Sequence, residues 1–224
     1  MKTTLITLAA ILAAAATAHA QIDVSNIKSI TVNKSASNAA VTGTREIGRS
    51  SLECVYKAVA PERGNEQEPV RMKEDRMILQ TGGAVSKFYS YYNFAKDSLL
   101  KADPNNALKA VEHKNGTAAC LYTGYPEAGR LTLTDAVAST YYTYEDKVPQ
   151  IKWTIGDQTR EILGYKCRRA DCDLYGRHFT AWFTDEIPVA SGPWKLQGLP
   201  GLIMAAADDE GLYSFEIIGL RSVE

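Results

Sequence analysis

Short segments in which apolar and polar residues alternate, separated by turn residues, limit what this chain can fold into more than any other feature. In the clearest segment, 51–58, the residues Leu52, Cys54, Tyr56 and Ala58 alternate with mostly polar ones. Such alternation places successive side chains on opposite faces of a strand. Because these segments recur at short spacing, the sequence predicts a mainly β (α+β) protein with an antiparallel, curved or partly closed sheet.

The other expected elements follow from the same pattern and from local composition. Strands are expected at 27–32, 70–79, 86–92, 117–122, 130–133, 138–144, 151–155, 162–169, 178–184 and 213–220, and the apolar run 202–207 has the length of a strand. One or two short helices are expected, at 93–101 and 105–113. Turns are expected at 175–177 and 208–211. With no evident repeat or linker, 21–224 is expected to be a single domain, with a loosely ordered segment at 21–48 and a distinctive core at 147–220.

The first twenty residues have the three parts of a cleaved secretory signal. Lys2 supplies the positive start, an Ala-rich apolar stretch follows, and Ala18-His19-Ala20 supplies the small residues that a signal peptidase reads. A helix that crosses a bilayer needs about 20 apolar residues, which neither this stretch nor any later one provides. We expect cleavage between Ala20 and Gln21, and a periplasmic or secreted protein without a transmembrane segment.

The charge balance excludes one class of partner. The chain has 25 basic and 26 acidic residues and a formal net charge of −1, which becomes −2 once Lys2 leaves with the signal. A nearly neutral surface gives no electrostatic basis for binding nucleic acid or an anionic membrane.

Four cysteines follow the signal: Cys54, Cys120, Cys167 and Cys172. An even number in an exported protein favours disulfides, here two, although three connectivities are open. One disulfide with two free thiols is the alternative. On a regular strand Cys167 and Cys172 would lie on opposite faces, so a bond between them would need a bulge or turn at 168–171. The spacing does not match a zinc site, and we expect no metal and no cofactor.

The stretch 147–220 combines tryptophans with closely spaced Pro and Gly. All three tryptophans of the chain lie in it: Trp153, Trp182 and Trp194. Leu199-Pro200-Gly201-Leu202 fits a type II turn, in which Pro sets the first φ and Gly takes the positive φ that follows. Gly192-Pro193 starts a second bend that presents the indole of Trp194. A buried indole N–H needs a hydrogen-bond partner, so this side chain either finds one or lies at the rim of a groove.

The same stretch contains Gly198-Leu199-Pro200-Gly201-Leu202-Ile203 and, upstream, Ile162 to Cys167, Gly176-Arg177, Ala181-Trp182-Phe183, Glu186-Ile187-Pro188 and Gly192-Pro193. In these motifs it resembles the GLPGLI family of exported Bacteroidetes proteins, which is named after the first of them. The resemblance is looser at Leu52-x-Cys54-x-Tyr56 and at Ser86 to Ser90. It implies an exported protein of unknown biochemical function and supplies no catalytic or ligand residue. The strand-rich pattern is also similar to that of curved-sheet periplasmic carriers of the lipoprotein-sorting type.

Catalytic patterns are weakly represented. Ser191-Gly192 lacks the frame of a serine hydrolase, although His178 lies nearby in the sequence. A nucleophilic pair of Cys172 and His178 would require a reduced thiol. Arg168, Arg169 and Arg177 either form a solvated strand face or a small anion site near Trp182.

We therefore predict a non-enzymatic binding or carrier module for an apolar ligand or peptide. Trp182, Trp194 and the cluster from Tyr89 to Tyr92 would border its groove, and Arg177 is a further candidate contact. The first alternative is a docking partner of an outer-membrane transport or assembly system, with Pro200 and Gly201 in the docking turn. The second is a hydrolase with an unrecognised site that uses His178.

Overall fold

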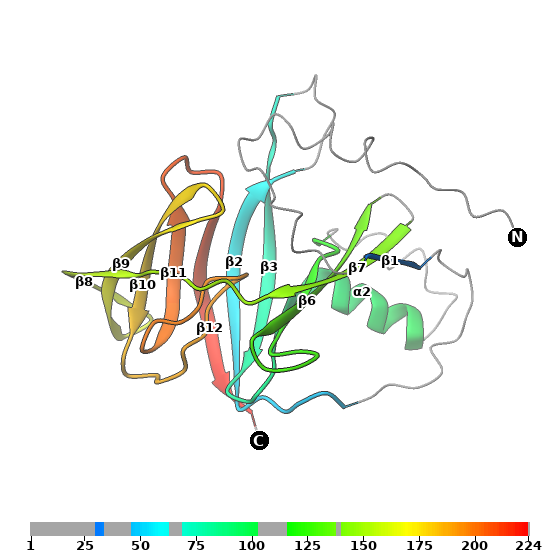
Figure 1. Ribbon diagram of the computed structural model, residues 1–224, viewed down its shortest axis with the longest axis horizontal. Coiled ribbons are helices and arrows are strands. Elements are labelled where there is room, and N and C mark those ends of the chain that lie inside the picture. The colour runs from blue at the N-terminus through cyan, green and yellow to red at the C-terminus, as the bar shows by residue number, and fades with distance from the viewer. Residues whose placement is uncertain (1–29, 34–45, 63–68, 103–115, 138–139, 224) are drawn as a thin grey trace, which may run out of the picture.

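The structure is a computed structural model that describes residues 30–33, 46–62, 69–102, 116–137 and 140–223 (Figure 1). The expected signal peptide, most of the segment 21–48 and the expected helix at 105–113 lie outside the described residues. Within the described part of the chain, no helix is long and apolar enough to span a membrane.

Strands make up most of the described chain. They are β1 (Ile30–Asn33), β2 (Leu52–Pro61), β3 (Met72–Thr81), β4 (Ser86–Ser90), β5 (Cys120–Thr123), β6 (Arg130–Val137), β7 (Thr140–Lys147), β8 (Thr154–Ile162), β9 (Tyr165–Leu174), β10 (Arg177–Thr184), β11 (Leu202–Asp208) and β12 (Ser214–Ser222). The one helix of this part is α2 (Tyr91–Ala102). The predicted mainly β fold is confirmed.

The described strands form a single open sheet of 12 strands in the order β1-β7-β6-β5-β4-β3-β2-β12-β11-β10-β9-β8. Apart from the pairs β1–β7 and β2–β12, neighbours in the sheet are also consecutive in the chain. Every pair is antiparallel. β1 lies at one edge, which confirms the edge strand expected near 27–32, and β8 lies at the other.

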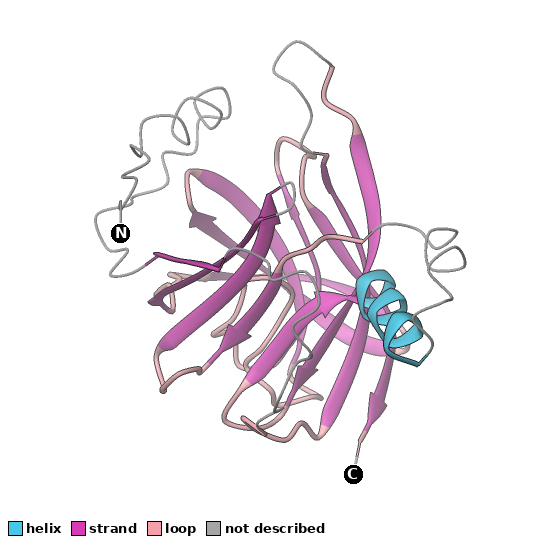
Figure 2. Cartoon of the chain, turned by 90° about the vertical axis from the view of Figure 1, so that its right-hand side faces the viewer, coloured by secondary structure: helices cyan, strands magenta, loops and turns pink. Residues whose placement is uncertain are grey.

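The sheet is strongly curved (Figure 2), so that distant strands face one another across its concave side. Phe88 on β4 and Phe215 on β12 are separated by β3 and β2, yet their ring centroids lie 6.2 Å apart. Three strand steps in a flat sheet would measure about 14 Å. Alternate residues, such as Cys54, Tyr56 and Ala58 of β2, are buried on this side and form the core.

Two tight turns connect β8, β9 and β10. Leu163-Gly164 and Tyr175-Gly176 have positive φ at both central positions, as in type I′ turns. The turn expected at 175–177 is confirmed. The strand expected at 162–169 is corrected, because Ile162 ends β8 and β9 begins only at Tyr165. The sequence did not predict the turn at Leu163-Gly164, because Asn or Asp is the usual residue before Gly in type I′ turns.

The predicted disulfides do not form, and all four cysteines are free thiols. Cys167 and Cys172 both lie on β9, which pairs with β10 in unbroken register over 168–174, so no bulge turns the two side chains to the same face. Cys54 faces the concave core, whereas Cys120 is paired with Tyr89 and faces the convex side. Burial raises the pKa of Cys54 to about 12, which keeps its thiol protonated.

Helix α2 confirms the helix expected at 93–101 and begins at Tyr91. The Ser90 hydroxyl accepts a hydrogen bond from the Asn93 N–H at 3.4 Å, as an N-cap does. The same hydroxyl donates to the buried carboxylate of Asp75 at 2.9 Å. The helix packs on β3 and β4, where the rings of Phe94 and Tyr89 meet edge to face at 5.7 Å.

Candidate functional site: a groove between the helix and the convex sheet face

The motif loop, residues 185–201 between β10 and β11, fills the concave face of the sheet. Leu196 and Leu199 of this loop are 0% and 1% exposed. Its backbone is fixed at the start of β11, where the Ile203 N–H donates to the Ser191 carbonyl at 3.0 Å. From β2, the hydroxyl of buried Tyr56 donates to the Ile203 carbonyl at 2.7 Å. The GLPGLI sequence is therefore a packing element of the core.

Close packing, and not a turn, explains Gly201. The predicted type II turn at 199–202 is wrong, because the positive φ of this region, 89°, belongs to Gly198. A Cβ on Gly201 would lie 2.0 Å from the carbonyl oxygen of Thr184. Pro200, its neighbour, is exposed.

Trp194 packs against the core in a left-handed backbone conformation, φ 54°, which is rare for a bulky residue. Its ring lies 5.8 Å from that of Tyr175 and 6.4 Å from that of Phe179. The next residue, Lys195, is 9% exposed, and its Nζ lies 4.7 Å from the Tyr175 ring centroid. Burial lowers the pKa of Lys195. This cluster attaches the motif loop to the turn at 175–176.

Trp182 lies on the opposite face of the sheet. It follows Phe179, which contacts Trp194, by three positions on β10, and an odd separation on a strand reverses the side-chain direction. The Arg160 guanidinium lies 4.6 Å over its ring. The two indoles therefore do not border one groove.

Arg177 holds the hairpin between β11 and β12. Its Nη1 lies 2.7 Å from Oδ2 of Asp208, whose side chain is fully buried, and 2.7 Å from Oε2 of Glu210. Arg168 and Arg169 are also paired, with Asp185 at 3.1 Å and Asp171 at 2.9 Å. The protein's own carboxylates thus neutralise all three arginines of the suggested anion site.

His178 is exposed on the convex face. Its Nδ1 lies 2.9 Å from Asp173, and this hydrogen bond raises the pKa of His178. Cys172 is paired with Phe179 on the other face, so it does not approach the imidazole. Among the described residues, no group of three or more His, Cys, Asp and Glu side chains is placed to hold a metal ion.

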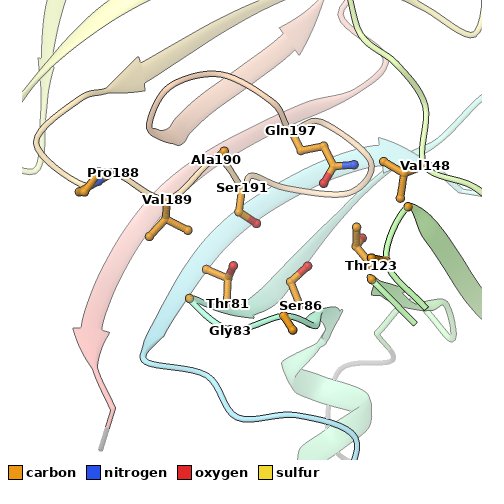
Figure 3. A pocket seen from close by; sticks show the side chains of 15 residues that line it. Thr81, Gly83, Ser86, Thr123, Val148, Pro188, Val189, Ala190, Ser191 and Gln197 are labelled. Carbon is orange, nitrogen blue, oxygen red and sulfur yellow. The ribbon is translucent and has the colours of Figure 1, made fainter. Parts of the chain in front are cut away.

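A pocket of about 480 Å³ opens where the motif loop meets the turns that follow β3 and β5 (Figure 3). Its lining is Thr81, Gly82, Gly83, Ala84, Ser86, Thr123, Gly124, Ala128, Gly129, Val148, Pro188, Val189, Ala190, Ser191 and Gln197. None of these side chains is charged or aromatic. The pocket therefore offers hydrogen-bonding groups without a charge or a ring to select a ligand.

A larger hollow, of about 550 Å³, lies between α2 and the convex face, and we name it the helix-side groove. Its lining is Glu53, Val55, Arg76, Ile78, Tyr89, Tyr91, Phe94, Ile218, Gly219 and Arg221. Four of these residues form a row of cross-strand partners, Tyr89, Ile78, Val55 and Gly219, from β4 to β12. This row is the floor of the groove, and Figure 2 shows α2 beside the sheet.

A bulge in β12 shapes the floor. Ile217 is paired with Tyr56 and Gly219 with Val55, which leaves Ile218 as the extra residue. Ile217 is buried in the core, whereas Ile218 is 46% exposed at the groove. A bulge inserts one residue and redirects side chains, and bulges are over-represented at sheet edges and next to active sites. Phe94 and Tyr91, 52% and 41% exposed, complete the apolar walls.

Sequence reasoning found part of this groove. The aromatic run predicted to border a groove supplies Tyr89 and Tyr91. Trp182, Trp194, Arg177, Pro200 and Gly201 are not among its lining residues. Ile218 and Arg76 were missed, because only the pairing of β12 with β2 and of β2 with β3 brings them near the helix.

The fold and site define a mainly β protein whose curved sheet encloses its own loop and leaves a groove on the outer face. Residues 175–205, from the last turn before β10 into β11, match a family model described as a protein of unknown function, Porph_ging. That segment contains the motif loop and none of the residues that line the helix-side groove. A search of the curated proteins finds no match.

Among solved structures, the chain is similar to PNGF-II. In its C2 crystal form the TM-score is 0.52 at 13% identity, over 78% of this chain and 28% of PNGF-II. In the P21 form the TM-score is 0.49 at 12% identity, over 78% and 29%. The chain thus spans less than a third of PNGF-II, and at this identity the similarity of the C2 form concerns the fold alone.

Proposed function

We propose that this protein is an exported, non-enzymatic binding module that takes an apolar ligand or peptide on the helix-side groove. The observation that carries the proposal is the gathering of half-exposed Tyr91, Phe94 and Ile218 around one apolar floor. Contiguous exposed apolar surface on a soluble protein commonly marks a binding site. The signal-like first twenty residues support export.

The placement of the motif loop favours the groove over the concave face as the binding surface. The side chains of Leu196 and Leu199 from this loop are almost completely buried and fill the concave face. The same burial argues against a docking role for the GLPGLI segment, in which Gly198 and Pro200 are exposed and Leu199, Gly201, Leu202 and Ile203 are buried.

Binding of the dye anilinonaphthalene sulfonate, whose fluorescence rises in apolar surroundings, tests the proposal. Ile218→Ser should lower the fluorescence of the bound dye several-fold. Ile155→Ser is the matched control, because Ile155 is 44% exposed and lies outside the groove. Equal fluorescence from the two variants would refute the groove as the binding surface.

A further inference from the structure

An apolar residue and a cationic residue of the groove lie two positions apart on one strand. Ile78 and Arg76 of β3 both line the groove. Within the described residues, Arg76 has no carboxylate at ion-pair distance, and its guanidinium lies 5.9 Å from the Tyr91 ring centroid. Arg221, in contrast, is paired with Glu53 at 2.7 Å. The groove thus combines an apolar floor with an excess positive charge.

The spacing of these two features matches that of an extended peptide. Alternate side chains of a strand point to the same side and are about 7 Å apart. A peptide that lies along β3 in extended form has the same repeat. We propose that the helix-side groove binds an extended peptide segment in which an apolar side chain and a carboxylate side chain are two residues apart. This inference rests on the proposed function and specifies its ligand.

In this arrangement the apolar side chain of the peptide lies on the floor at Ile78 and Gly219, between Phe94 and Ile218. The carboxylate pairs with Arg76, whose planar guanidinium can donate two parallel hydrogen bonds to it. Val55 supplies apolar surface beside Ile78, because the two residues are cross-strand partners.

The exposure of the walls favours a peptide over an acyl chain with a carboxylate head. Tyr91, Phe94 and Ile218 remain 41% to 52% exposed, so the groove is open along one side. Sites for small apolar molecules bury most of the ligand surface. An acyl chain in this groove would keep one side in water, whereas a peptide backbone presents polar groups to that side.

Gly219 provides a variant that closes the groove without disturbing the fold. A Cβ at this position meets no atom within 4 Å, and its backbone is outside the left-handed region. Gly219→Val should therefore place its methyl groups on the floor. Gly156→Val is the matched control, because Gly156 is also on a strand with its nearest contact at 3.9 Å, and it lies far along the sheet on β8.

The test is fluorescence anisotropy of the labelled peptide Gly-Ser-Phe-Ser-Glu-Ser-Gly with the full chain. Replacing the peptide Glu by Gln should weaken binding about fivefold, the size of one partly exposed charge pair. Arg76→Gln in the protein should remove that preference, whereas Arg71→Gln, at an exposed position outside the groove, should keep it. Gly219→Val should abolish binding of both peptides, and Gly156→Val should not.

Three results would overturn the inference, and they are distinguishable from failure of the proposed function. Equal binding of the Glu and Gln peptides would refute the role of the carboxylate. Tighter binding of a peptide with adjacent Phe and Glu would refute the proposed spacing of two residues. Binding of sodium decanoate but of no peptide makes the ligand an acyl chain. In each case, loss of dye binding in Gly219→Val would still support the groove as the binding surface. Dye binding that is unchanged in Gly219→Val would refute the proposed function itself.

Discussion

The two faces of the curved sheet use apolar residues in opposite ways. On the concave face the chain covers its own surface, because the motif loop supplies Leu196 and Leu199, which are almost completely buried. On the convex face, Phe94 and Ile218 stay about half exposed although they lie against an apolar floor. The stability gained by burying apolar surface is sufficient to explain why the concave residues are apolar. The convex residues contribute less to stability, and their placement is consistent with the binding role that we propose for the groove.

The matched sequence motif and the groove in which we propose that a ligand binds lie in different parts of the sheet. The matched segment, 175–205, builds the packed interior and contains no residue of the helix-side groove. The groove is built from β2, β3, β4, α2 and β12, which are outside that segment. The matched segment therefore concerns packing, and the groove in which we propose that a ligand binds lies elsewhere on the sheet.

The largest change in stability is expected from a substitution on the concave side. Leu199→Ala should lower the free energy of unfolding by about 3 kcal/mol, since it leaves a cavity in a closed core. Pro200→Ala, one residue away and exposed, should cost about 0.5 kcal/mol through the unfolded chain. Urea denaturation followed by circular dichroism measures both. Similar losses from the two substitutions would contradict the packing role of the motif.

The second largest loss of stability should come from removing the Tyr56 hydroxyl, which donates to the Ile203 carbonyl of the motif. Tyr56→Phe leaves the buried Ile203 carbonyl without its hydrogen bond at 2.7 Å and should cost about 2 kcal/mol. Tyr141→Phe is the control, because Tyr141 is 59% exposed. The same denaturation experiment serves here, and an unchanged midpoint for Tyr56→Phe would show that the contact contributes nothing.

Lys195 should give the concave side a dependence on pH. Burial lowers the pKa of Lys195 in the folded state, so the unfolded chain binds more protons between that pKa and the ordinary value of 10.5. The contribution of Lys195 to stability should therefore rise as the pH increases through this window. The difference in unfolding free energy between the native chain and Lys195→Met, measured from pH 7 to 10.5, isolates the effect. A difference that stays constant or falls would contradict it.

The smallest effect on stability is expected on the convex side. Gly219→Val should change the free energy of unfolding by no more than about 0.5 kcal/mol, as for substitutions that create no clash. Gly201→Val, whose Cβ would meet the Thr184 carbonyl oxygen at 2.0 Å, should destabilise the protein strongly. Thermal unfolding of the two variants makes the comparison. A marked loss for Gly219→Val would mean that the groove is part of the core.

Local pattern was sufficient for much of the fold. Alternation predicted β2, and Tyr175-Gly176 predicted its turn. The pattern failed at Gly201, where a glycine needed for close approach to Thr184 was interpreted as a turn glycine. It failed again at Ile218, because the bulge that exposes it depends on the register of β12 with β2. Pairing between distant strands cannot be predicted from the residues beside Ile218 in the sequence, so the sequence alone could not predict the groove.

The most direct test of the account is a two-dimensional amide NMR titration of the full chain with the peptide Gly-Ser-Phe-Ser-Glu-Ser-Gly. If the peptide binds in the helix-side groove, the perturbed amides should gather at 53–55, 76–78, 89–94 and 218–221, the segments around this groove. The amides of the motif loop, 185–201, should remain unchanged. Perturbations concentrated in the motif loop, with none around the groove, would contradict it.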